Sequence, residues 1–153
     1  MKLVDLIPPD AVRADLESSG KMDVLSELGG LLSRSCPRLE TDEITRILIE
    51  RERLATTGVG EGVAIPHGKA GNLDSLAGAV GLSRTGIPFD AVDGEPVRIF
   101  FALIAPLNST GEHLKALARI SRLLKDPEFR DRLTSCRGSE EIRDVIANAD
   151  AGH

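Results

Sequence analysis

An almost continuous apolar segment, PVRIFFALIAP at residues 96–106, constrains the fold more than any other part of the chain. Strands that are buried on both faces read as unbroken apolar runs, whereas half-exposed strands alternate apolar and polar residues. The apolar stretch from Ile99 to Ala105 is also far too short to span a bilayer. The segment therefore predicts a central strand of a sheet that other elements cover on both faces.

Helical patterns occur early in the chain. The segment MDVLSELGGLLS at 22–33 places its apolar side chains on one helical stripe, at Val24, Leu25, Leu28, Leu31 and Leu32. We expect a second helix to follow Thr41 as its N-cap, with Asp42 and Glu43 in a first turn where acidic side chains suit the helix dipole. Ahead of both, the alternation of apolar and charged residues over 12–16 predicts a half-buried strand.

Strand-like and helical segments continue to alternate toward the C-terminus. We expect strands at GVAIP (62–66) and GAVGLSR (78–84). Ser109 and Glu112 have the spacing of a capping box at the start of a helix, Pro127 fits the first position of a short helix, and Ser139 is the expected cap of the last one. The fold class is therefore α/β, with a mixed parallel and antiparallel sheet flanked by helices on both faces.

Length, charge and cysteine usage narrow the class of protein. A chain of 153 residues suits one domain, residues 1–153. Its net charge of −5 argues against nucleic acid as a partner. No secretory signal or membrane-spanning segment is apparent, so we expect a cytoplasmic protein without direct membrane insertion. Cys36 and Cys136 lack metal-ligand spacing and are interpreted as reduced thiols, with a disulfide as the less favoured alternative.

The segment TGVGEGVAIPHGKAG at 57–71 is the candidate functional loop. Pro66 favours an extended residue before it, so we expect His67 at the end of a strand, exposed on the loop. Gly68 would let a partner approach the imidazole ring closely. The alternating glycines could turn backbone N–H groups toward an anion, with hydroxyl donors beside them, which predicts a phosphate cradle at Thr56, Thr57, Gly58, Gly60, Gly62 and Gly68.

Other interpretations of this loop fit less well. A dinucleotide fingerprint needs a strand before the glycines and a helix after them, and here the expected order is reversed. Lys69 is followed by Ala70 instead of Ser or Thr, so a P-loop fails too. His67, His113 and His153 lack zinc spacing, no GxSxG is present, and we expect neither a metal nor a cofactor. A plain tight turn with a surface histidine remains the alternative from spacing alone.

The pattern TGVGEGVAIPHGK resembles the phosphorylation-site signature of the fructose/mannitol-type enzyme IIA domains of the bacterial phosphotransferase system. Within that group the chain resembles the nitrogen-regulatory enzyme IIA proteins, and the likeness extends from LVDLIPPDAV to HLKALARISRLLKDPEFRDRL. The resemblance implies that His67 accepts a phosphoryl group from a phosphohistidine on a histidine phosphocarrier protein. It also implies that His113 and Arg51 converge on His67 at one shallow face.

The resemblance leaves more than one function open. The leading interpretation is a phosphocarrier whose phosphorylation state selects regulatory protein partners. The alternative is a freestanding sugar-specific enzyme IIA that donates phosphate to a IIB protein in fructose or mannitol uptake. A module that has kept the fold and lost phosphotransfer is less favoured because His67, His113 and Arg51 are all present. Lys69 is interpreted as a solvated charge.

Overall fold

Strand β6 (Val97–Pro106) forms the centre of the sheet in the computed structural model, which describes residues 1–152. It pairs antiparallel with β5 (Ala77–Ile87) on one side and parallel with β3 (Val63–Ala64) and β4 (His67–Ala70) on the other. Two short strands complete the sheet: β1 (Val12–Arg13) lies parallel to β5, and β2 (Gly58–Gly60) lies antiparallel to β3. The predicted mixed sheet and its central strand are confirmed.

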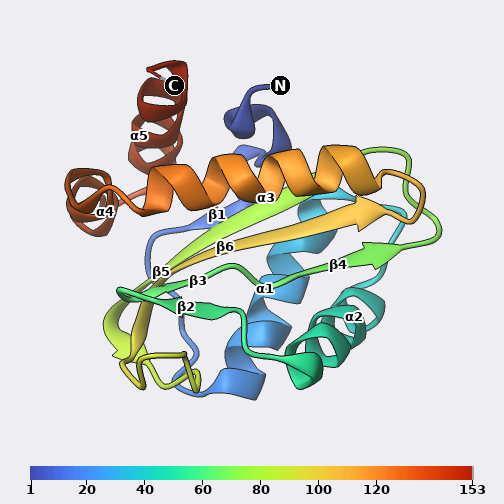
Figure 1. Ribbon diagram of the computed structural model, residues 1–153, viewed down its shortest axis with the longest axis horizontal. Helices are drawn as coiled ribbons and strands as arrows, with labels where there is room; N and C mark the ends of the chain where they lie inside the picture. The colour runs from blue at the N-terminus through green and yellow to red at the C-terminus, as the bar shows by residue number, and fades with distance from the viewer. Residues whose placement is uncertain (153) are drawn as a thin grey trace.

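Helices cover both faces of this sheet, as Figure 1 shows. On one face lie α1 (Lys21–Ser35) and α2 (Thr41–Leu54). On the other lie α3 (Thr110–Leu124), α4 (Pro127–Thr134) and α5 (Ser139–Ala151), together with the N-terminal 3-10 turn η1 (Leu3–Leu6). A second 3-10 turn, η2 (Pro9–Ala11), leads into β1. Among residues 1–152, no helix combines the length and apolarity that a membrane span needs.

The side chains of β6 explain why this segment lies between two helical layers. Phe100, Ala102 and Ile104 pack into the core on the α1 and α2 side. Their neighbours Phe101 and Leu103 pack into the core on the α3 side, because successive side chains of a strand point to opposite faces. Both faces are therefore fully apolar, and only Arg98 within this strand is exposed.

Several predicted helix boundaries need correction. Thr41 and Ser139 are the first residues of α2 and α5, and the extended N-cap residues are Glu40 and Gly138, neither of which makes a side-chain cap bond. Ser109 does precede α3, but its hydroxyl donates to the carbonyl of Pro106, so the predicted capping box does not form. The one predicted cap geometry that holds is at α4, where the Asp126 carboxylate accepts from the backbone N–H of Glu128 and Pro127 opens the helix.

Two further expectations concern β1 and the cysteines. The strand expected over 12–16 is shorter, although Leu16 N–H still donates to the carbonyl of Leu82 at 2.8 Å. Cys36 and Cys136 are both free and buried, in the cores on opposite sides of the sheet. Burial raises the pKa of the Cys36 thiol to about 11, which keeps it protonated and unreactive at neutral pH.

Candidate functional site

His67 is the first residue of β4, which corrects its expected position on an exposed loop. The carbonyl of Pro66 accepts from Leu103 N–H at 2.9 Å, and His67 pairs in register with Leu103. His67 is only half-buried, whereas the following Gly68 is buried. The pairing with β6 therefore holds the imidazole on a strand at the edge of a rigid sheet.

Gly68 lets helix α2 pack closely against this strand. A Cβ atom added at Gly68 would lie 2.4 Å from Cγ2 of Ile47, closer than real Cβ contacts allow. The space beside the glycine is thus occupied by α2 and is not free for a partner, contrary to the expectation from the sequence. The consequence for the site is that α2 is fixed next to His67.

The second histidine reaches the site from the opposite layer. His113 lies in the first turn of α3, where its N–H donates to the carbonyl of Ser109 at 2.9 Å. Its side chain is only 5% exposed, and its ring centroid lies 5.5 Å from that of His67 with the rings at 74°. Nε2 of His113 is buried and has no hydrogen-bond partner among residues 1–152. Buried polar atoms without partners are rare, and this one belongs to the ring that neighbours His67.

Burial keeps both imidazoles neutral at neutral pH. The pKa of His113 is lowered to about 4, first by burial and then by the nearby positive charges of His67 and Lys69. The pKa of His67 is also lowered, mainly by burial and further by Arg51, against the hydrogen bond to Ile65 and the charge of Glu52, which raise it. A neutral imidazole retains one nitrogen lone pair, so His67 is able to act as a nucleophile.

These lowered pKa values predict a loss of stability in mild acid. In the unfolded chain the histidines bind protons below about pH 6.5, whereas in the folded chain His113 binds one only near pH 4. The contribution of neutral His113 to the free energy of unfolding is therefore fully present above about pH 6.5 and falls as the pH is lowered toward about 4. One such histidine contributes a slope of about 1.4 kcal/mol per pH unit within this window. Urea unfolding at about pH 7 and about pH 5 should show that the pH dependence is smaller in His113→Gln than in the unaltered protein. Equal pH dependence in the two proteins would contradict this assignment.

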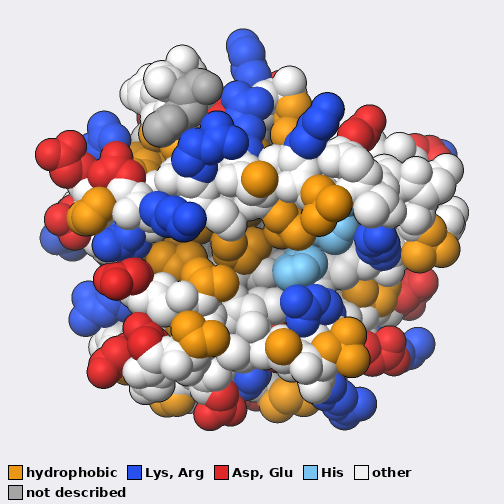
Figure 2. Space-filling model, viewed as in Figure 1, with side chains coloured by type: hydrophobic (Ala, Val, Ile, Leu, Met, Phe, Trp, Pro, Cys, Tyr) orange, Lys and Arg blue, Asp and Glu red, His pale blue; other side chains and the backbone are white. Residues whose placement is uncertain are grey.

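Arg51 completes the group of residues around His67. It lies in the last turn of α2, and its Nη1 donates to the carbonyl of Ala55 at 3.0 Å. Arg51, His67 and His113 line one open cavity of about 590 Å³. Figure 2 shows the histidine side chains in this hollow, with hydrophobic side chains and Lys and Arg side chains around it. The structure thus brings the three predicted catalytic residues together.

The rim of this cavity is mainly apolar and basic, with Glu50 as an acidic member. Leu54 and Leu114 line it and are 81% and 62% exposed. Lys69, on the same side of β4 as His67, places Nζ 3.1 Å from the Thr110 hydroxyl at the start of α3. Exposed leucines beside polar, convergent side chains are typical of a surface that another protein covers.

Glu52 is a site residue that the sequence analysis did not single out. Its buried carboxylate accepts from the N–H and the hydroxyl of Thr57, at 2.9 Å and 2.5 Å, and lies 3.2 Å from Nζ of Lys21. This network fixes the end of α2, next to Arg51, to the segment that leads into β2. The sequence pattern at this helix end did not indicate that the Glu52 carboxylate is buried, because its burial depends on contacts distant in sequence.

The predicted phosphate cradle is not assembled beside His67. Among its members, only Gly68 lines the histidine cavity. Gly60, Glu61 and Gly62 have positive φ angles of 98°, 58° and 75°, and they form the tight turn that pairs β2 with β3. The remaining groups are occupied elsewhere: Gly58 N–H donates to the hydroxyl of Thr56, and the hydroxyl of Thr57 donates to Glu52. The alternating glycines serve the hairpin.

Within residues 1–152, no cluster of three or more potential ligand side chains could hold a metal ion.

Comparison with known proteins identifies the group to which this site belongs. The profile of the family described as phosphoenolpyruvate-dependent sugar phosphotransferase system, EIIA 2, matches residues 5–149. The chain belongs to this family. A nitrogen regulatory protein of Bradyrhizobium diazoefficiens is 38% identical to this EIIA domain over 147 residues, which is 96% of this chain and 95% of that protein.

Solved structures share the EIIA fold. The crystal structure of nitrogen regulatory protein IIA-Ntr from Neisseria meningitidis superposes with a TM-score of 0.88 at 34% identity, over 94% of this chain and 98% of the other. A chain of the complex between mannitol enzyme IIA and phosphorylated enzyme IIB from Escherichia coli matches with a TM-score of 0.77 at 18% identity, over 92% and 96%. The latter likeness concerns the fold alone, and in that system an EIIA domain pairs with a IIB component.

Proposed function

We propose that Nε2 of His67 accepts a phosphoryl group from a phosphohistidine on a histidine phosphocarrier protein. One observation carries this proposal: Nδ1 of His67 lies 2.7 Å from the carbonyl oxygen of Ile65. A carbonyl oxygen only accepts hydrogen bonds, so Nδ1 carries the ring proton and Nε2 retains its lone pair. Nε2 is therefore the nucleophilic atom.

The transfer needs no added proton or cofactor. The Nε2 lone pair forms the new N–P bond while the donor N–P bond breaks and its electron pair returns to the donor imidazole. The His67 ring becomes positively charged as it keeps its Nδ1 proton. The hydrogen bond to Ile65 then becomes charge-assisted, which stabilises the product.

Arg51 and His113 compensate the charge of the transferred group in this proposal. The Arg51 guanidinium presents a planar set of donors that matches phosphate oxygens, and it reaches them by leaving the Ala55 carbonyl. The unpartnered Nε2 of His113 gains a phosphate oxygen as its hydrogen-bond partner when it carries a proton. Phosphoryl transfer depends mainly on such positioning and charge stabilisation.

Removing the Arg51 side chain is expected to slow transfer without unfolding the chain. A hydrogen bond to a charged group contributes about 1.5–3 kcal/mol, so Arg51→Ala should lower the transfer rate about 10- to 100-fold. The measurement is single-turnover labelling from the phosphorylated carrier protein, with thermal unfolding as the control for folding. Arg46→Ala, on an exposed position of the same helix, is the matched control and should retain the full rate. A rate within about twofold of the unaltered protein would make Arg51 a solvated charge only.

The output proposed for the phosphorylated site is regulatory. Phosphorylation adds about −1.5 to −2 charges to the face that carries Leu54, Leu114 and Arg51. A partner that buries the unmodified apolar rim would be repelled by this charge, and a partner with a basic surface would be favoured. The likeness to nitrogen regulatory proteins supports this choice. The alternative is a sugar-specific EIIA that passes phosphate to a IIB protein, which the shared fold with mannitol enzyme IIA supports.

Affinity capture from the source cells separates the two outputs. Free protein and phosphorylated protein serve as baits, and the regulatory proposal expects each form to recover different cytosolic proteins. Deletion of the gene for this protein in the same cells is then expected to leave the uptake of fructose and mannitol intact. Loss of uptake of a single sugar, together with identical captured proteins in both forms, would favour the sugar-specific alternative.

A further inference from the structure

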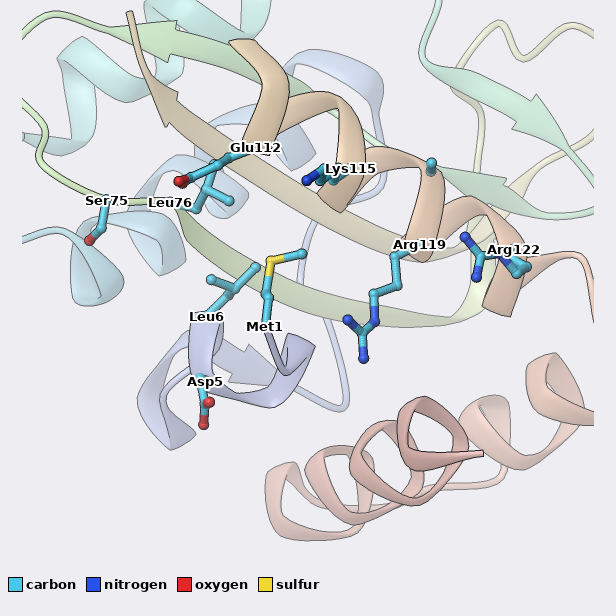
Figure 3. A pocket seen from close by; sticks show the side chains of 10 residues that line it. Met1, Asp5, Leu6, Ser75, Leu76, Glu112, Lys115, Arg119 and Arg122 are labelled. Carbon is cyan, nitrogen blue, oxygen red and sulfur yellow. The ribbon is translucent and has the colours of Figure 1, made fainter. Parts of the chain in front are cut away.

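A second, larger cavity lies on the opposite edge of α3 from the histidines. Its volume is about 790 Å³, and it is bounded by α3, by η1 and by the segment that enters β5. Figure 3 shows the side chains that line it. None of these residues lines the histidine cavity. We refer to this second space as the α3–η1 cavity.

Cationic side chains line the α3 wall of the α3–η1 cavity, and the two arginines lie at one end of it. Lys115, Arg119 and Arg122 follow one another at intervals of four and three residues, so they share one edge of α3. Nε of Arg119 donates to the carboxylate of Asp150 at 2.5 Å, and the other oxygen of Asp150 accepts from Leu3 N–H at 2.9 Å. Because Asp150 is only 4% exposed, this pairing holds the guanidinium in one orientation.

The positive charge along this wall is only partly compensated within the protein. Lys115 and Arg122 form no ion pair within 4.0 Å among residues 1–152, in a chain whose net charge is −5. Asp150 uses one oxygen on Arg119 and the other on the backbone, which leaves the Nη groups of Arg119 available. A pre-oriented guanidinium beside two further cations is suited to a carboxylate or phosphate group.

The rest of the α3–η1 cavity differs in character. Met1 and Leu6 form an apolar middle section. Glu112 and Ser75, with Leu76 beside them, lie at the end away from the arginines, whereas Asp5 lies apart from them, beyond Leu6 on η1, as Figure 3 shows. Concave sites with apolar walls and a few polar groups are typical places for small ligands. An inorganic anion would use only the cationic end.

We infer that the α3–η1 cavity binds a small organic anion whose body carries hydroxyl or amine donors at the end distant from its charged group. The anionic group lies at Arg119 and Arg122, the body covers Leu6 and Leu76, and the donors reach Glu112 and Ser75. A phosphorylated or a carboxylated compound would provide this chemistry. Because Glu112 directly precedes His113, the occupant contacts the helix that places His113 beside His67.

The test is a titration of isotope-labelled protein followed by amide NMR, at an ionic strength of about 0.15 M. The probes are glucose 6-phosphate, L-glutamate, inorganic phosphate and glucose. We expect saturable shifts at residues 3–6, 75–76 and 115–122 with glucose 6-phosphate or L-glutamate, and the one that binds identifies the anionic group. Arg122→Ala and Lys115→Ala are expected to weaken this binding at least about tenfold. Lys125→Ala, an exposed cation outside the cavity, is expected to leave it unchanged.

Three outcomes would overturn the inference. These are the absence of saturable shifts with both organic anions, equal affinity for inorganic phosphate, or equal weakening by Lys125→Ala. The titration is repeated with His67→Ala, which is expected to bind the same probe with the same affinity. The result is thus independent of whether His67 carries a phosphoryl group.

Discussion

His67→Ala is expected to abolish phosphoryl transfer to this chain. Within the described residues of the site, His67 alone has its ring proton fixed by a backbone carbonyl. That carbonyl lies 2.7 Å from Nδ1, so the proton stays on Nδ1 and Nε2 is left to react. His113, the neighbouring histidine, is only 5% exposed and is therefore less accessible to a carrier protein than the half-buried His67. Incubation with phosphoenolpyruvate, enzyme I and the histidine phosphocarrier should label the unaltered protein and leave the variant unlabelled.

The control for this experiment is the folded state of the variant. His67 is half-buried at the start of β4, so His67→Gln is tested beside His67→Ala to keep a polar side chain of similar size. Both variants should unfold cooperatively, and both should remain unlabelled. Label that persists in a folded variant would place the chemistry on another residue and would remove the basis of the proposed function.

His113→Ala is expected to slow transfer to His67 about 100-fold, the usual effect of removing one donor that stabilises developing charge. The reason is the buried Nε2 of His113, which has no partner among residues 1–152 and lies next to the accepting ring. His113→Gln places an amide donor near the position of Nε2 and should recover much of the rate. Single-turnover kinetics with the phosphorylated carrier measure both variants.

The pair of variants distinguishes a hydrogen-bond role from a packing role. If His113 only fills space, His113→Ala would lose stability with little change in the transfer rate of the folded fraction. Equal rates for His113→Ala and the unaltered protein would contradict the proposed contact with the phosphoryl group. Equal losses in the Ala and Gln variants would show that the amide cannot replace the imidazole, and would favour a role specific to the ring.

Apolar patterns predicted the layers of this fold correctly. The continuous run over 96–106 became β6, buried on both faces, and the stripe over 22–33 became the buried side of α1. Patterns of this kind report burial, which depends on many side chains at once. A helix cap contributes only about 1 kcal/mol, so a cap residue is a weak signal, and α2 and α5 begin one residue before the expected first turn.

The site was harder to predict because its geometry depends on contacts distant in sequence. Strand β4 contains His67, Gly68 and Lys69, which have no strand pattern, and it exists because β6 pairs with it. Alternating glycines suggested an anion cradle, whereas Glu61 and its flanking glycines form a hairpin turn. The approach of His113 and Arg51 to His67 was implied only by the family resemblance, and no spacing in the chain indicated it.

The central claim is that Nε2 of His67 carries the phosphoryl group. Protein with ¹⁵N-labelled histidine, phosphorylated through the carrier, can be measured by ¹⁵N and ³¹P NMR, which distinguish the two ring nitrogens. We expect one phosphohistidine, at His67, with phosphorus on Nε2 and the proton on Nδ1, where the carbonyl of Ile65 accepts its hydrogen bond. Phosphorus on Nδ1 of His67, or on either nitrogen of His113, would contradict the account.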